Sequence, residues 1–168
     1  MNRFYKPLLI GIAGLVVVML GFSLILPNQV MTSKWVKVQQ DKDSVINVVK
    51  NLQTWDQWNS LLRGAEAIDV KDSLLSWKSP NGHQNTIRIE GVEANGISTS
   101  ISLNKSKYFN SGFSIEKRSS DSVQVVWYII EDLKWYPWEK FYGMMAADMK
   151  GPLMQESLDR LKTYLDQR

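Results

Sequence analysis

The stretch that most constrains the fold is residues 135–168, because its apolar residues recur at the period of a helix. Counted from Trp138, they fall at i, i+3, i+4, i+7 and i+11 on one face, at Trp138, Phe141, Tyr142, Met145 and Met149, and the spacing resumes at Met154, Leu158, Leu161 and Leu165. Gly151 and Pro152 interrupt the pattern, and Pro152 has no N–H for the helical ladder, so we expect a kink or two segments there. A stripe of this length needs a partner surface, which predicts a long C-terminal helix lying across a sheet.

Strand patterns before this helix supply the sheet. Apolar or β-branched residues alternate with serine over residues 97–103, and Asn81-Gly82 and Asn95-Gly96 are hairpin signals. Residues 123–130 are apolar on both faces, as in a strand buried on each side. The connections are too short for crossovers, so we predict five or six antiparallel strands in a meander.

One strand and two short helices are predicted ahead of the meander. Residues 34–39 alternate as a strand does, and Asp43 is a plausible N-cap for the helix that follows. Trp55 and Trp58 then lie on one side of a further helical turn, where they either line a cavity or pack the helices onto the sheet. The predicted fold class is therefore α+β.

Residues 8–26 form an uncharged run of 19 residues. At about 1.5 Å per residue this run can cross a hydrocarbon layer about 30 Å thick. A cleaved signal peptide usually has a shorter apolar core and a small-x-small site, which the sequence near Leu26-Pro27 does not offer. We therefore predict a basic tail (residues 1–7), a transmembrane anchor (8–26), a linker (27–33) and one domain (34–168).

Charge gives a weak indication of orientation and argues against nucleic acid as a partner. Arg3 and Lys6 precede the anchor and favour an N-terminus inside the cell, although Lys34 and Lys37 follow it. This predicts a single-pass membrane protein with a periplasmic or otherwise extracytoplasmic domain. Beyond the basic tail, 18 basic residues face 17 acidic ones, so there is no basic footprint for nucleic acid.

The element order and three short sequences resemble a known superfamily. The sequences are Trp55-Asp56-Gln57-Trp58, Val126-Trp127 and Leu158-Asp159-Arg160-Leu161-Lys162. They are similar to the START-like (SRPBCC) superfamily of polyketide cyclase/dehydrase and lipid transport proteins, in particular its small bacterial members with an N-terminal membrane anchor. The resemblance covers roughly residues 34–167. It implies a helix-grip fold, a curved antiparallel sheet around the terminal helix, with a deep cavity for lipids, sterols, polyketides or other hydrophobic molecules.

The candidate ligand-binding residues are large apolar side chains of the helices and the sheet. They are Trp55, Trp58, Trp77, Trp127, Trp138, Phe141, Tyr142, Met145 and Met149. Methionine side chains adapt to irregular ligands, and four of them (Met144, Met145, Met149 and Met154) cluster near the expected bend, either as cavity lining or as core. The aromatic loop at residues 133–138 fits a cavity mouth, an interfacial membrane anchor or a rigid packed loop.

Residues for chemistry are sparse. The chain has no cysteine, and its one histidine, His83, lies beside a turn, so we expect no metal, no cofactor and no nucleophile of the Cys-His or Ser-His type. Arg88 and Glu90 share a strand face that we predict to be solvated, since Ile87 and Ile89 take the other face.

Three functions remain open. The leading hypothesis is a membrane-anchored, non-enzymatic module that holds a hydrophobic small molecule or lipid between sheet and helix. The second is a cyclase or hydratase that uses Glu90, Arg88 or Tyr128 as acid/base groups, which requires one of them to face the cavity. The third is an envelope interaction domain with a filled core and no ligand.

Overall fold

The computed structural model describes residues 5–105, 107–119 and 121–167, apart from the side chains of residues 144, 146 and 147. The elements, in chain order, are α1 (Tyr5–Ile25), β1 (Gln29–Val38), α2 (Lys42–Lys50), η1 (Leu52–Thr54), α3 (Trp55–Trp58), η2 (Ser60–Leu62), β2 (Glu66–Lys71), β3 (Leu74–Lys78), β4 (Gln84–Glu93), β5 (Gly96–Leu103), β6 (Lys107–Ser119), β7 (Ser122–Asp132) and α4 (Pro137–Asp166). The predicted order of strand, helices, meander and terminal helix is confirmed.

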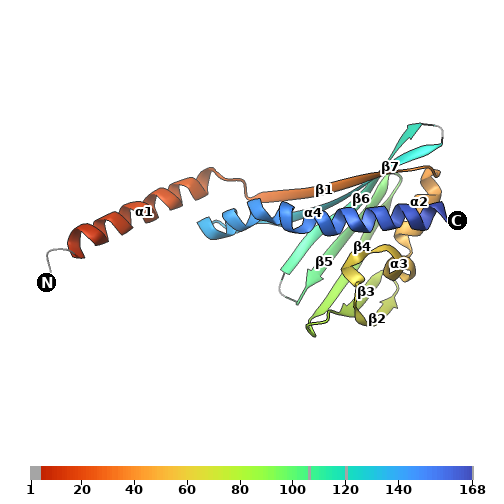
Figure 1. The fold of residues 1–168 in the computed structure, drawn as a ribbon, viewed down its shortest axis with the longest axis horizontal. Coiled ribbons are helices and arrows are strands. Elements are labelled where there is room, and N and C mark those ends of the chain that lie inside the picture. The colour runs from red at the N-terminus through yellow and green to blue at the C-terminus, as the bar shows by residue number, and fades with distance from the viewer. Residues whose placement is uncertain (1–4, 106, 120, 168) are drawn as a thin grey trace.

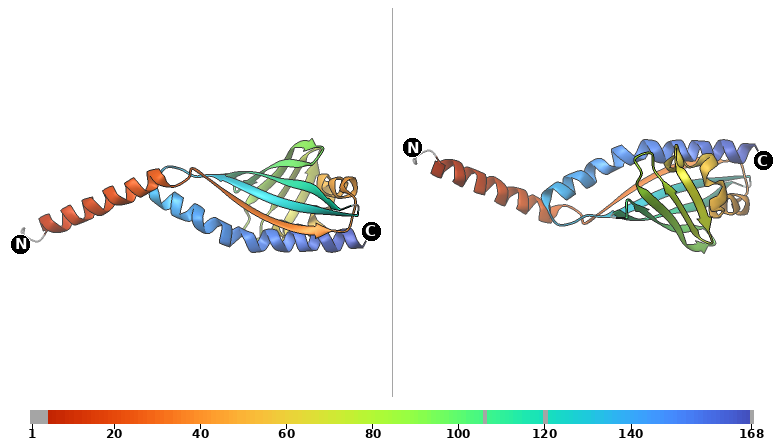
Figure 2. Two further views of the ribbon diagram at one scale, coloured as in Figure 1. Left: turned by 90° about the horizontal axis from the view of Figure 1, so that it is seen from above. Right: turned by 90° about the horizontal axis from the view of Figure 1, so that it is seen from below.

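The strands form one antiparallel sheet in the order β1-β7-β6-β5-β4-β3-β2. The meander runs from β2 to β7, and β1 pairs with β7 from Gln29 opposite Asp132 to Val38 opposite Val123. The sheet curves, α4 lies along it, and α2 and α3 lie at the end remote from α1 (Figures 1 and 2). The predicted α+β architecture, a curved sheet around a terminal helix, is confirmed.

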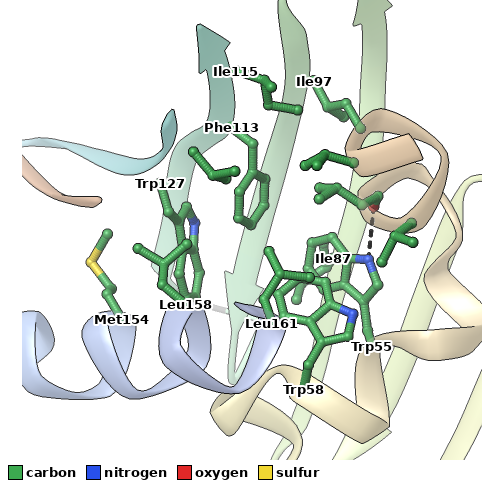
Figure 3. Packing of buried hydrophobic residues seen from close by; sticks show 14 of the residues in the cluster. Trp55, Trp58, Ile87, Ile97, Phe113, Ile115, Trp127, Met154, Leu158 and Leu161 are labelled. Atoms are coloured by element: carbon green, nitrogen blue, oxygen red, sulfur yellow. Dashed lines mark hydrogen bonds between the residues drawn. The ribbon is translucent and has the colours of Figure 1, made fainter. Parts of the chain in front are cut away.

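An aromatic cluster forms the centre of the core (Figure 3). Phe113 of β6 stacks on Trp127 of β7 with ring centroids 5.3 Å apart, and its edge meets Trp55 and Trp58 at 5.8 and 6.0 Å. The Trp55 indole donates a hydrogen bond of 2.8 Å to the Val49 carbonyl, which ties α3 to the end of α2. The second half of α4 covers this cluster with Met154, Leu158, Leu161 and Leu165, all at most 2% exposed.

The prediction that one apolar stripe faces the sheet along all of α4 is wrong for the first half of the helix. Four stripe residues are 69, 47, 62 and 64% exposed: Trp138, Phe141, Met145 and Met149. The opposite side of the helix packs against the end of the sheet. Gly143 lies on that side, and a Cβ on Gly143 would overlap the side chain of Leu133. α4 continues through Pro152 as one helix, and its bend carries the first half away from the sheet (Figure 2).

Two predicted boundaries also need correction. β1 begins at Gln29, so most of the predicted linker 27–33 is strand. Its side chains are largely polar, but its backbone pairs with β7, where Ser33 lies opposite Tyr128. The N-cap of α2 is Asp41 instead of Asp43, because the Asp41 carboxylate accepts a hydrogen bond of 2.9 Å from the Ser44 N–H.

Lys140 fastens α1 to the start of α4. Its side chain is buried, and its ammonium donates to the carbonyls of Leu26 (3.4 Å) and Pro27 (2.7 Å) and to Asn28 Oδ1 (2.6 Å). A cation at this place also interacts favourably with the carboxyl end of α1. The apolar helix and the domain are thus held together by polar contacts next to the sheet.

Replacement of Lys140 by methionine should weaken this junction. Losing the shared donor removes three partly buried hydrogen bonds from a charged group, which costs about 1–3 kcal/mol. Each kcal/mol should lower the melting temperature by about 2–4 °C in a chain of this size. Thermal unfolding of the full chain, followed by circular dichroism, measures the shift. Lys162→Met is the matched control, because Lys162 is exposed on the same helix. Equal melting temperatures for the two variants would contradict the assigned role.

Candidate functional site

An apolar cavity lies between the sheet and α4. Its volume is about 220 Å³, and every residue that lines it except Lys150 is apolar: Leu61, Ile101, Leu103, Phe109, Trp127, Ile129, Met149, Lys150, Leu153 and Met154. Inward-facing positions of β5, β6 and β7 form one wall, and α4 forms the other. Such a cavity favours an apolar group that is transferred out of water.

A larger, more polar space lies at the end of the domain that bears α1. This vestibule has a volume of about 530 Å³ and is lined by Lys107, Tyr108, Phe109, Glu131, Asp132, Leu133, Lys134, Glu139 and Tyr142. It is formed by the start of β6, the end of β7 and the first turns of α4. The Lys107 ammonium lies 4.5 Å from the centroid of the Tyr142 ring, a cation–π contact across the vestibule.

Phe109 and one ion pair form the boundary between the two spaces. Phe109 lines both of them, and the Lys150 ammonium lies 4.1 Å from the centroid of its ring. Lys150 also pairs with Glu131, and the side chains are 20 and 7% exposed. Neither Lys150 Nζ nor Glu131 Oε1 has a hydrogen bond to another group within the described residues.

The surroundings of Lys150 have two opposite effects on its pKa. Burial, and then the positive charge of Lys107, lower the pKa of Lys150 to about 8. The Glu131 carboxylate beside it favours the charged form. The ion pair therefore keeps a charged group at the edge of an apolar cavity, where an unpaired charge would be costly.

The four candidate tryptophans of the helices and the sheet do not share one role. Trp55, Trp58 and Trp77 are at most 2% exposed and belong to the core, so they pack the helices and the sheet together. Trp127 belongs to the same core and also lines the apolar cavity. The sequence-based alternative of core packing therefore describes Trp55 and Trp58, and Trp77 belongs to the same core.

The candidates on α4 are also divided. Met149 lines the apolar cavity and Tyr142 lines the vestibule. Trp138, Phe141 and Met145 are outside the described lining of both spaces and are exposed on the other side of the helix. Met154 is buried and lines the cavity, while the side chain of Met144 lies outside the described residues.

Sequence reasoning missed the polar residues of the boundary. Glu131 follows Trp127 and Ile129 at two-residue spacing, so strand alternation alone assigns it to the inward face. Lys107 is related to Phe109 in the same way on β6. Lys150 had no comparable signal, because the apolar stripe indicated the wrong face for this half of α4.

The acid/base candidates of the enzyme hypothesis face away from the cavity. Arg88 and Glu90 are exposed, as predicted, and Glu90 accepts a hydrogen bond of 2.5 Å from Ser100 Oγ on the outer face. Tyr128 also lies on the outer face, where its hydroxyl packs against Gly112. His83 is exposed beside its turn. Among the described residues, no group of three potential metal ligands comes together.

Comparisons with known proteins identify the architecture. No protein-family model matches the sequence, and no curated protein matches it. A solved START superfamily protein from Mycobacterium smegmatis matches with a TM-score of 0.60 and 18% identity, over 82% of this chain and 98% of its own.

Two solved enzymes have the same architecture. A truncated norcoclaurine synthase from Thalictrum flavum matches with a TM-score of 0.64 and 13% identity, over 83% of this chain and 95% of its own. An aromatase/cyclase from Streptomyces sp. R1128 matches with a TM-score of 0.64 and 12% identity, over the same shares. At these identities the likeness concerns the fold.

Proposed function

From the START-like helix-grip fold that the chain has, we propose that this protein is a membrane-anchored module that binds an amphiphilic small molecule or lipid between sheet and α4. The prediction of this fold from the sequence resemblance is confirmed. The ligand, its source and the anchoring are the proposed part.

The observation that carries the proposal is the pair of adjoining spaces that meet at Phe109. Ligand pockets typically measure about 300–1,000 Å³; the vestibule, at about 530 Å³, lies in this range, and the apolar cavity, at about 220 Å³, is smaller. A ligand that uses both spaces has an apolar end for the cavity and a polar end for the vestibule. Transfer of its apolar end from water would contribute about 25 cal/mol per Å² buried.

α1 supports the membrane anchor. It is the one helix in the described part of the chain that is long and apolar enough to cross a membrane, and its 21 residues span about 30 Å, the thickness of a hydrocarbon layer. Arg3 and Lys6, which precede the uncharged run of residues 8–26, favour an N-terminus inside. The domain would then be periplasmic or otherwise extracytoplasmic.

The alternatives have less support. A cyclase or hydratase could not use Arg88, Glu90 or Tyr128, which face outward, and would have to act through Glu131 and Lys150 at the boundary. An interaction domain with a filled core leaves the apolar cavity unexplained. A chemically altered ligand in the assay below would favour the enzyme.

Native mass spectrometry of the full chain, released from lipid nanodiscs, tests ligand binding. We expect a discrete bound amphiphile on the wild type and its loss from Leu153→Trp, because Leu153 is half-buried in the cavity wall. Losing about 100 Å² of ligand burial costs roughly 2.5 kcal/mol, more than tenfold in affinity.

Lys162→Trp is the matched control, since it places the same ring on an exposed position of the same helix. It should retain the amphiphile. A ligand-free wild type, or equal occupancy of the two variants, would overturn the proposal.

A further inference from the structure

Three aromatic residues, the exposed Trp135 and Trp138 and the half-buried Tyr136, lie in contact where the chain leaves the sheet and enters α4. Trp135 and Trp138 are 63 and 69% exposed. Tyr136 stacks on Trp138 with centroids 5.0 Å apart and meets Trp135 at 5.4 Å. We call these three residues the aromatic collar. Exposure of indole and phenol rings to water costs free energy, and exposed apolar patches often mark sites where a protein or a membrane binds.

A hydrogen bond fixes the level of the collar along α1. Ser23 Oγ donates to the Trp135 carbonyl, and Ser23 is the buried residue of α1. Ser23 stands two residues before the end of α1 at Ile25, which is about 3 Å along the helix axis. If α1 spans the hydrocarbon layer, Trp135 lies at the edge of that layer.

Polar contacts keep the collar and α1 from separating. Lys140, one turn into α4, binds the Pro27 carbonyl and Asn28 Oδ1, and the Leu133 N–H donates to the Asn28 carbonyl at 2.7 Å. These bonds join the exit of α1 to both ends of the loop that carries the collar. The fold therefore fixes the position of the collar relative to the carboxyl end of α1.

The mouth of the vestibule lies at the same end of the domain. Asp132, Leu133 and Lys134 line the vestibule and lead directly into Trp135. Asp132 pairs with Gln29, which follows closely after α1. Figure 2 shows α1, the start of β1 and the start of α4 meeting at this end.

We propose that the collar lies in the headgroup layer of the bilayer that α1 spans and holds the mouth of the vestibule against the lipid, so that the ligand enters from the membrane. This inference rests on the proposed function. Tryptophan and tyrosine prefer this layer because their rings are apolar with one polar group. The Lys134 ammonium, 5.8 Å from the centroid of the Tyr136 ring, adds a cation where lipid phosphates lie.

Trp35 offers a matched control within the same chain. It is 59% exposed, but it lies seven residues beyond Asn28, about 20 Å farther along the extended strand β1. The tryptophans of the core, Trp55, Trp58, Trp77 and Trp127, are at most 2% exposed and are shielded from lipid. The collar and Trp35 are thus the exposed tryptophans of the described residues.

The test is fluorescence quenching of the full chain in phosphatidylcholine vesicles that contain brominated phosphatidylcholine, with the bromines near the glycerol end of the acyl chains. The wild type and Trp35→Phe should lose the same amount of emission, since Trp35 contributes only unquenched light. The double variant Trp135→Phe/Trp138→Phe keeps aromatic rings for packing and should lose the quenching.

Equal quenching of the double variant and the wild type, or an unquenched wild type, would overturn the inference. In that case another surface, such as a second copy of the chain, covers the collar. Native mass spectrometry of the wild type, released from lipid nanodiscs, separates the two proposals. A wild type that carries its amphiphile but shows no collar quenching removes the inference and leaves the proposed function.

Discussion

Replacement of Trp127 by alanine is expected to lower the free energy of unfolding by about 3–5 kcal/mol, a large part of the about 5–15 kcal/mol that holds an ordinary domain together. Trp127 is 1% exposed, stacks on Phe113, and donates a hydrogen bond of 2.9 Å to Ser111 Oγ. Its removal would leave a void beneath α4 that the rigid sheet cannot close. It would also merge this void with the apolar cavity that the ring lines.

Thermal unfolding of the full chain, followed by far-ultraviolet circular dichroism, measures this loss. Trp127→Phe is the matched control, because it keeps a ring against Phe113 and loses only the bond to Ser111. We expect it to lose less than half as much stability as the alanine variant. Similar losses for both variants would show that the hydrogen bond, and not the packing of the ring, stabilises this part of the core.

Separating the charges of Lys150 and Glu131 is expected to give two variants with opposite pH dependences. Lys150→Met leaves a carboxylate, 7% exposed, without its cation. Removing one partner of a buried pair costs about 3–5 kcal/mol, and partial exposure favours the lower end of this range. Burial raises the pKa of the stranded carboxyl group above its unfolded value of about 4.3. Between these two values the folded state binds more protons, so stability falls as pH rises.

Glu131→Gln strands the lysine instead. In the wild type, burial and Lys107 lower the pKa of Lys150 to about 8, from an unfolded value of 10.5. Loss of the Glu131 carboxylate lowers the pKa of Lys150 further. Between these values the folded state binds fewer protons than the unfolded state, so the stability of this variant should rise with pH across that window. The two slopes therefore have opposite signs and lie in different pH ranges.

Urea unfolding of the full chain between pH 4 and pH 11 would measure both slopes. The double variant Glu131→Gln/Lys150→Met carries neither charge and is the control, with a smaller pH dependence in both windows. Slopes of the same sign for the single variants would contradict the assigned pairing.

Local patterns allowed much of the fold to be predicted from the sequence. Alternation in β5 and the Asn-Gly signals identified the meander, and these patterns depend on neighbours in sequence. The second half of α4 was predicted correctly for the same reason, since Leu158 and Leu161 lie on its buried face. The resemblance then led to the correct fold.

The site was harder to predict, because it depends on which face each half of α4 turns toward the sheet. Helical periodicity places Met145 and Leu158 on one stripe, but it cannot show that only Leu158 has strands beneath it. The Glu131–Lys150 pair joins a strand to a helix, and no spacing along the chain links the two residues. Strand alternation gave the direction of Glu131 alone, without its partner.

The attachment of α1 through β1 has a mechanical consequence. β1 follows α1 directly and pairs with β7 along its whole length, from Gln29–Asp132 to Val38–Val123. Tension applied through α1 pulls along the strand, while the ladder bonds lie perpendicular to it. The bonds therefore carry the load together in shear and do not open one after another like a zipper. A pull on α1 would therefore move the whole sheet before it could peel off β1.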